Sequence, residues 1–212
     1  NIDKENIKFN MSIYVASTVF GGLVGRIFSG FIATNLSYEF VFYSLSLAIL
    51  VSIYFISKLS YEGEATISKP KITDVMEILK DKRFLIIYFL MFCVFFVFSG
   101  VLNILPFRVK EISSNVSEFQ ISLLYLGYGM GILISLNSSK IVKFFKNELN
   151  TILFGLIFFL FITTFLIQEN IIFIFLLIFL FCVGMFTVHT VSTGLANSMK
   201  ESQKSLTSGM YL

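Results

Sequence analysis

Residues 171–196 read IIFIFLLIFLFCVGMFTVHTVSTGLA and contain no lysine, arginine or acidic residue. At about 1.5 Å rise per residue, a helix of this length crosses a hydrocarbon core of roughly 30 Å. Hydrophobic residues make up 56% of the chain and charged residues 14%, whereas soluble domains carry about 25% charged residues. Five similar stretches precede this one, at approximately 11–33, 40–56, 84–105, 119–136 and 151–167. The sequence therefore predicts an all-α, polytopic transmembrane helical bundle.

The two ends of the chain bear on how complete this bundle is. The chain opens on Asn1 rather than on methionine. At its other end, residues 209–212 begin a new apolar segment after a basic connection. We therefore expect an internal fragment with six full spans and the start of a seventh.

Lysine and arginine are sorted between alternate connections. Thirteen of the sixteen lie before the first span, in 57–83, in 137–150 or after the sixth span. Arg108 and Lys110 occupy the opposite loops, and Arg26 lies inside a span. Because such residues remain on the cytoplasmic side, we expect the start of the chain and both basic loops in the cytoplasm. The net charge of +3 reflects this sorting and not nucleic-acid binding.

The connection at 57–83 is longer than the others and holds six basic residues. Within it Ile72, Val75, Met76 and Leu79 recur at helical spacing, and Asp74 followed by Glu77 is typical of a helix start. This pattern predicts a short interfacial helix on the inner leaflet. A recruitment site for a protein partner is the alternative.

The two cysteines, Cys93 and Cys182, occur singly within different spans. This arrangement favours neither a disulfide nor a metal site. We expect structurally inert thiols, and no metal or cofactor.

Two spans carry stripes of small residues spaced by four positions. One stripe comprises Ser17, Gly21, Gly25, Ser29 and Ala33, and the other Gly127, Gly131, Ser135 and Ser139. Small residues let helix backbones approach closely, which is the usual basis of helix association in lipid. The stripes predict either static packing or a surface along which two bundles move.

Arg26 is the one charged side chain well inside a span. Insertion scales place the cost of such a residue at about 2.5–3.5 kcal/mol at the helix centre, so something should offset it. Its four-spaced neighbours are Gly22 and Gly30, and none of the six spans holds an acidic residue. Two interpretations remain open: structural anchoring to another helix, or a part in substrate binding or conformational coupling.

Three segments resemble one family of membrane proteins. GGLVGRIFSG at 21–30 resembles the glycine-rich fifth helix of major facilitator superfamily transporters, in particular bacterial arabinose and drug efflux permeases. Gly184, Phe186, His189 and Gly194, followed by LTSGMYL at 206–212, resemble the tenth helix and the entry to the eleventh. NILPF at 103–107 resembles the outer end of the seventh helix. The resemblance covers nearly the whole chain, from about the fifth helix to the start of the eleventh.

The resemblance implies a division into two bundles. Residues 1–56 would be the last two helices of the N-terminal bundle, 57–83 the cytoplasmic inter-bundle linker, and 84–212 the C-terminal bundle, truncated within its fifth helix. The stripes through Gly25 and Gly131 would face each other across the gap between the bundles. The protein would be a multi-pass protein of the bacterial cytoplasmic (inner) membrane and, by analogy, a monomer.

Polar and aromatic side chains inside spans mark expected substrate contacts. On the third span these side chains share one broad helical face, and on the sixth they lie around a histidine. This histidine either hydrogen-bonds a neighbouring helix or takes part in substrate contact or proton handling. The expected substrate-binding residues are Tyr88, Phe92, Phe96, Ser99, Asn103, Phe186, His189 and Thr193. The expected helix-packing and conformational residues are Gly21, Gly22, Gly25, Arg26, Ser29, Gly30, Gly127, Gly131 and Ser135.

The function predicted from these features is secondary active transport of a small molecule by alternating access. Efflux is the expected direction, and protons are the candidate coupling ion. No Walker-type loop occurs, so ATP drive has no support in the sequence. An intramembrane hydrolase using Ser99 with His189 is one alternative, although no third, orienting acid lies within the spans. A passive channel is the other, although no ring of charge is visible.

Overall fold

The computed structural model describes residues 4–60 and 72–199, and in these ranges all regular structure is helical. Six helical segments are long and apolar enough to cross a membrane, and they correspond to the six predicted spans. The predicted fold class is therefore confirmed. The expected seventh span, at 209–212, lies outside the described residues. The elements are α1 (Lys4–Asn35), α2 (Tyr38–Ser57), α3 (Ile72–Lys80), α4 (Lys82–Ile112), α5 (Glu118–Leu123), the 3-10 helix η1 (Leu124–Tyr128), α6 (Gly129–Phe144), α7 (Glu148–Phe165) and α8 (Ile171–Met199).

Short polar side chains fix where four of the helices begin. Asp81 caps α4 by accepting from the backbone N–H of Arg83, and Ser117 begins α5 with a capping box completed by Gln120. The side chains of Asn147 and Asn170 accept backbone N–H groups in the first turns of α7 and α8. Each cap satisfies a donor that the start of a helix would otherwise leave unpaired.

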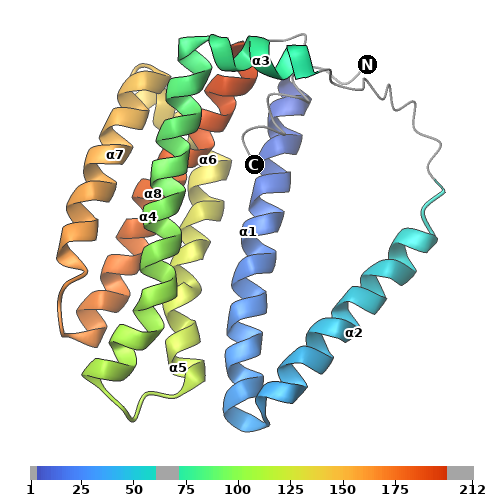
Figure 1. Cartoon of the computed structure of the whole chain (residues 1–212), viewed down its shortest axis with the longest axis vertical. Coiled ribbons are helices and arrows are strands. Elements are labelled where there is room, and N and C mark those ends of the chain that lie inside the picture. The colour runs from blue at the N-terminus through green and yellow to red at the C-terminus, as the bar shows by residue number, and fades with distance from the viewer. Residues whose placement is uncertain (1–3, 61–71, 200–212) are drawn as a thin grey trace.

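Helix α8 lies at the centre of a bundle in which α4, α6 and α7 surround it (Figure 1). Its side chains Ile174, Ile178, Phe181 and Val188 are fully buried. Helix α1 packs along α5, η1 and α6, on the side of the bundle away from α7. The core therefore runs lengthwise along α8, and α1 forms one wall beside it.

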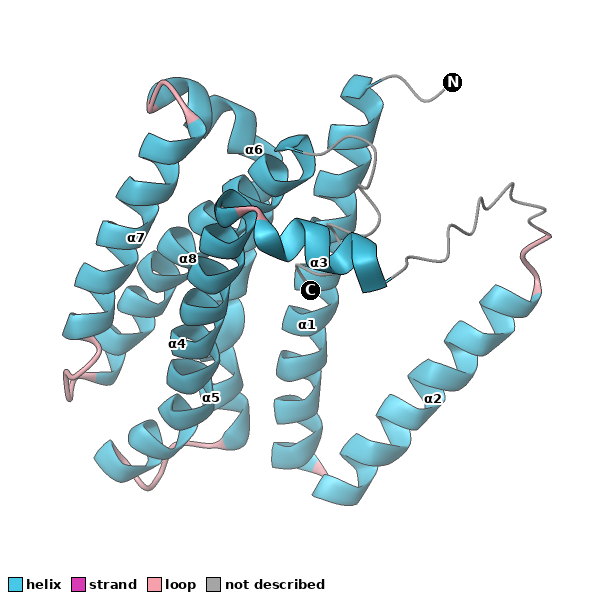
Figure 2. Ribbon diagram, turned by 45° about the horizontal axis from the view of Figure 1, so that its top comes forward, coloured by secondary structure: helices cyan, strands magenta, loops and turns pink. Residues whose placement is uncertain are grey.

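Helix α2 diverges from the bundle after the tight turn that follows α1 (Figures 1 and 2). Val41, near its first turn, is its one buried residue in the described part of the chain. Large apolar side chains along the rest of α2 are exposed, including Phe42 at 69% and Phe55 at 66%. This exposure suits a helix whose neighbours are lipid or other membrane segments.

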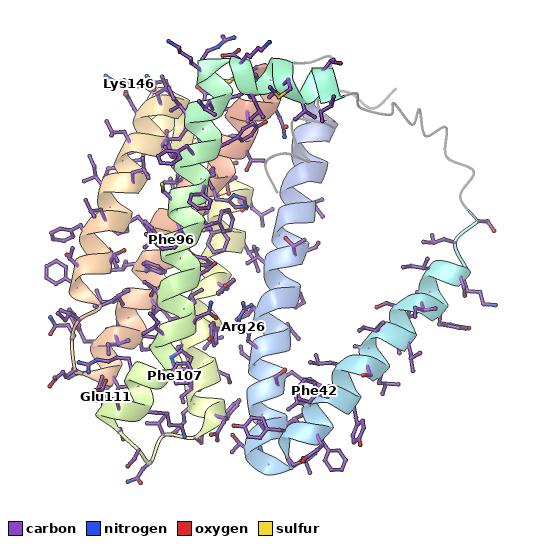
Figure 3. All side chains as sticks on the ribbon, in the orientation of Figure 1. Arg26, Phe42, Phe96, Phe107, Glu111 and Lys146 are labelled. Carbon is purple, nitrogen blue, oxygen red and sulfur yellow. The ribbon has the colours of Figure 1, made fainter. Side chains whose placement is uncertain are left out.

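The predicted helix in the 57–83 connection is present as α3, which is already helical at Ile72, two residues before the expected start at Asp74. It lies across one end of the bundle, which we call the α3 end; Lys146 lies at the same end (Figures 1 and 3). Ile72 and Met76 are exposed, whereas Ile78 is fully buried. The helix thus presents an apolar stripe away from the bundle, and its position on a leaflet stays a prediction.

Two predicted boundaries differ from the structure. The span expected at 119–136 is not one regular α-helix, because η1 interrupts it between α5 and α6. The span expected to end at residue 105 continues through Pro106 to Ile112. Proline has no N–H to donate to the carbonyl one turn earlier. The helix nevertheless continues, because the side chain of a neighbouring helix donates a hydrogen bond to that carbonyl.

The expectation that the stripes through Gly25 and Gly131 face each other is wrong. A methyl group added at Gly131 would lie 2.7 Å from the Phe186 ring of α8, and one at Gly127 would lie 2.8 Å from Ile178 of the same helix. A methyl group added at Gly25 would meet no atom within 4 Å in the described part of the chain. Gly127 and Gly131 therefore face α8, although α1 also contacts η1 and α6.

Candidate functional site

A cavity of about 350 Å³ lies where α1 meets α4, η1 and α8. Its size is within the range of small-molecule sites, which is roughly 300–1,000 Å³. Its walls combine phenylalanine and tyrosine rings with aliphatic side chains and several polar groups. The lining residues are Thr18, Val19, Gly22 and Arg26 of α1, Phe95, Phe98, Ser99, Leu102 and Asn103 of α4, Tyr128 of η1, and Met185, Phe186 and His189 of α8.

Arg26 reaches from α1 toward the bundle and is held by two aromatic rings (Figure 3). Its guanidinium carbon lies 5.1 Å from the centre of the Tyr125 ring and 4.8 Å from that of Tyr128. Nη1 also donates to the carbonyl of Gly22, one turn earlier on α1, at 3.1 Å. Cation–π attraction strengthens when the cation is partly desolvated, so the two rings offset part of the cost of a charge inside a span.

Pro106 fixes the position of one of these rings. In a regular helix the carbonyl of Leu102 would accept from the N–H of residue 106, which proline does not have. The hydroxyl of Tyr125 donates to that carbonyl at 3.2 Å. The proline thus creates an acceptor on α4 that holds Tyr125 of η1 beside Arg26.

We expect Tyr125→Phe to lower the free energy of unfolding by about 1 kcal/mol, because the Leu102 carbonyl loses its donor. In a Pro106→Ala background, the new backbone N–H of residue 106 donates to the Leu102 carbonyl. Tyr125→Phe should then lower the free energy of unfolding by less than half as much as it does with Pro106 present. A double-mutant cycle measured by unfolding in mixed micelles checks this coupling. Tyr128→Phe is the matched control; equal costs of Tyr125→Phe in both backgrounds would contradict the account.

Four of the eight predicted substrate-binding residues line the cavity: Ser99, Asn103, Phe186 and His189. The ring of His189 packs edge-on against Phe95, with centroids 5.1 Å apart. The structure therefore brings the polar groups of α4 and α8 together with Arg26. Their contact with a substrate stays a prediction.

The other four do not line this cavity. Tyr88, Phe92 and Phe96 lie on the same broad face of α4 as Ser99 but nearer the α3 end, and Phe92 and Phe96 are 66% and 72% exposed. Thr193 donates its hydroxyl to the carbonyl of His189 within α8, at 2.7 Å. A substrate that touched these residues would have to occupy space between the cavity and the α3 end.

The predicted packing residues fall into distinct environments. Ser135 is fully buried and hydrogen-bonds Thr190 of α8 at 3.1 Å. Gly21 is exposed, Ser29 is half-buried, and a methyl group added at Gly22 would meet the Arg26 side chain at 3.2 Å. Gly30, by contrast, is buried beside α5, as described next.

Near the end of the bundle opposite α3, α1 and α5 are in close contact. A methyl group at Gly30 would lie 2.5 Å from Cβ of Ser122. The backbone N–H of Phe119 donates to Oγ1 of Thr34 at 2.9 Å, and the ring of Phe119 packs edge-on against Phe31. We call these five residues the α1–α5 contact.

Reasoning from the sequence missed most of the aromatic wall. Tyr125, Tyr128, Phe95 and Phe98 were not expected at the site, although the two tyrosines together hold Arg26. Two tyrosines three residues apart lie on one helical face, which could have indicated a partner for the isolated arginine.

The fold and the cavity define a multi-pass helical membrane protein with a small-molecule-sized site between its helices. A sequence model of the Major Facilitator Superfamily matches residues 2–211, and the chain belongs to this family. Comparisons with curated proteins and with solved structures gave no significant match. The family is one of secondary transporters that move small molecules across membranes, and the corresponding prediction is confirmed at that level.

Proposed function

We propose that the protein exports a small organic molecule by alternating access, with the cavity between α1, α4, η1 and α8 as part of its substrate site. The observation that carries the proposal is the cavity itself, in which Arg26, Asn103 and His189 converge from three helices. Sites of secondary transporters lie between repeats that move against each other. Protons are the proposed coupling ion, and the bacterial cytoplasmic membrane is the proposed location.

The division into moving parts follows the connection at 57–83. We propose that residues 1–56 belong to one bundle and 84–212 to the other, joined by this cytoplasmic linker, and that the protein acts as a monomer. The α1–α5 contact would then join the two bundles at their outer ends. Its close approach at Gly30 and the Thr34–Phe119 hydrogen bond support a closed outer side in this conformation.

The direction and the coupling ion can be tested on cells that produce the full-length protein. A panel of fluorescent drugs and labelled sugars is followed with and without a protonophore. Export that stops when the proton gradient collapses is the expected result. Movement unaffected by the gradient would contradict proton coupling, and hydrolysis of a substrate that depends on Ser99 would favour the enzyme alternative.

A cross-link across the α1–α5 contact should stop transport. Thr34→Cys and Phe119→Cys are combined in a background of Cys93→Ser and Cys182→Ala, and a short bifunctional thiol reagent joins the two cysteines, which lie side by side. We expect loss of nearly all flux in proteoliposomes and its recovery on reduction of a cleavable reagent, because the outer side can no longer open. Each single cysteine variant is the control. Undiminished flux in the cross-linked protein would contradict the proposed movement.

A further inference from the structure

The cavity contains a positive charge that its own walls do not balance. Among the described residues that line the cavity, Arg26 is the one Lys or Arg, and none is a carboxylate. In the sequence, all thirteen acidic residues lie outside the six apolar stretches. Where the structure describes ion pairs, they join residues near helix ends or in connections, as in Arg108 with Glu111 and with Glu169, and Lys110 with Glu118.

The two tyrosines position this charge without neutralising it. An aromatic face attracts a cation through its quadrupole, but it carries no net charge. The guanidinium has five N–H donors in one plane, and a planar fork of this kind suits a carboxylate. One donor goes to the carbonyl of Gly22, and Arg26 is among the exposed residues, so part of the fork is accessible from the cavity.

The rest of the cavity suits the apolar part of a ligand. Phe95, Phe98 and Phe186 supply aromatic walls, and the amide of Asn103 adds one polar group on α4. Phe98 and Phe186 pack edge-on in this wall, with centroids 5.9 Å apart. A ligand with one anionic head and an aromatic body would contact both kinds of surface.

We propose that the cavity selects amphipathic organic anions, with Arg26 pairing with a carboxylate and the phenylalanine walls holding an apolar body. The inference rests on the proposed function, because it names the substrate class of the same site. A carboxylate in this position would form charge-assisted hydrogen bonds and offset the cost of a cation within the membrane.

Three probes that share one ring system test the selectivity. Purified full-length protein in detergent is titrated with 2-naphthoate, the neutral 2-naphthamide and the cationic 2-naphthylmethylammonium, and the melting temperature is recorded. A ligand that binds only the folded state raises this temperature. We expect 2-naphthoate to bind about tenfold to a hundredfold more tightly than the amide, as is typical of a hydrogen bond to a charged group.

Variants identify the residue responsible. Arg26→Gln should abolish the preference for the anion, whereas Arg26→Lys should retain part of it because the charge remains. Arg108→Gln is the matched control, since it removes the same charge from an ion pair outside the cavity and should leave the preference unchanged. If Arg26→Gln does not fold, the comparison of wild type with Arg26→Lys still decides, because the lysine lacks the planar fork and should bind the anion less tightly.

Equal stabilisation by all three probes would overturn the inference and leave the proposed transport function intact. A preference for the anion that persists in Arg26→Gln would likewise overturn it. Stabilisation by none of the probes would also overturn it, while the cross-linking experiment on the α1–α5 contact would still test transport separately.

Discussion

Replacing Gly184 with valine is expected to eliminate most of the correctly folded protein. A methyl group at Gly184 would lie 2.9 Å from Cα and 3.0 Å from N of Phe159, so the obstacle is the backbone of α7. A change of rotamer cannot relieve such a clash, and α7 and α8 must move apart. Overpacking typically costs about 1–3 kcal/mol, and a backbone obstacle places the expected loss at the upper end or beyond. The yield of monodisperse protein and its melting temperature measure this effect.

Gly194→Val is the matched control on the same helix. A methyl group there meets no atom within 4 Å in the described residues, and the change in helix propensity is the same. We therefore expect near-normal yield and melting temperature for this variant. A similar loss of yield and melting temperature in both variants would contradict the view that Gly184 is needed for the close packing of α7 on α8.

Gly131→Leu is expected to block transport while leaving much of the protein folded. A methyl group at this position would already lie 2.7 Å from the Phe186 ring, which is buried between α6 and the cavity. The larger side chain should drive that ring into the cavity, because α6 and α8 leave no room elsewhere. We expect flux in proteoliposomes to fall about tenfold or more, since the displaced ring takes space from the ligand in a cavity of only about 350 Å³.

Phe186→Ala should partly reverse this effect. In the double variant the leucine at 131 occupies the space that the phenylalanine ring has vacated, so the cavity reopens and flux should recover severalfold. Phe186→Ala alone serves as the reference. Flux that stays low in the double variant, despite a recovered melting temperature, would contradict the proposed displacement of the ring.

The membrane spans could be predicted because length and hydropathy alone define them. Residues 171–196 form nearly all of α8, and the other five stretches also fall in helices, apart from residues 166–167, which follow α7. Two details escaped prediction for identifiable reasons. The 3-10 segment η1 lies within an uninterrupted apolar run, and α4 passes through Pro106 because Tyr125, far away in the sequence, bonds the free carbonyl.

The site could be predicted only in part. Arg26, Asn103 and His189 were identifiable because polar side chains are costly inside spans and therefore conspicuous. The partners of Arg26 were not identifiable in this way, because a buried cation is expected to pair with a carboxylate, whereas Arg26 packs against two aromatic rings. The prediction that the two glycine stripes face each other was also wrong. A stripe of small residues indicates that some helix packs closely there, but the sequence does not show which helix it is.

The accessibility of position 103 from each side of the membrane tests whether the cavity is a site with alternating access. Asn103→Cys in the background without native cysteines is treated with a membrane-impermeant thiol reagent, in vesicles of both orientations. We expect labelling from both sides, and loss of outside labelling alone when Thr34→Cys and Phe119→Cys are cross-linked. Labelling from one side only, or outside labelling unchanged by the cross-link, would contradict alternating access.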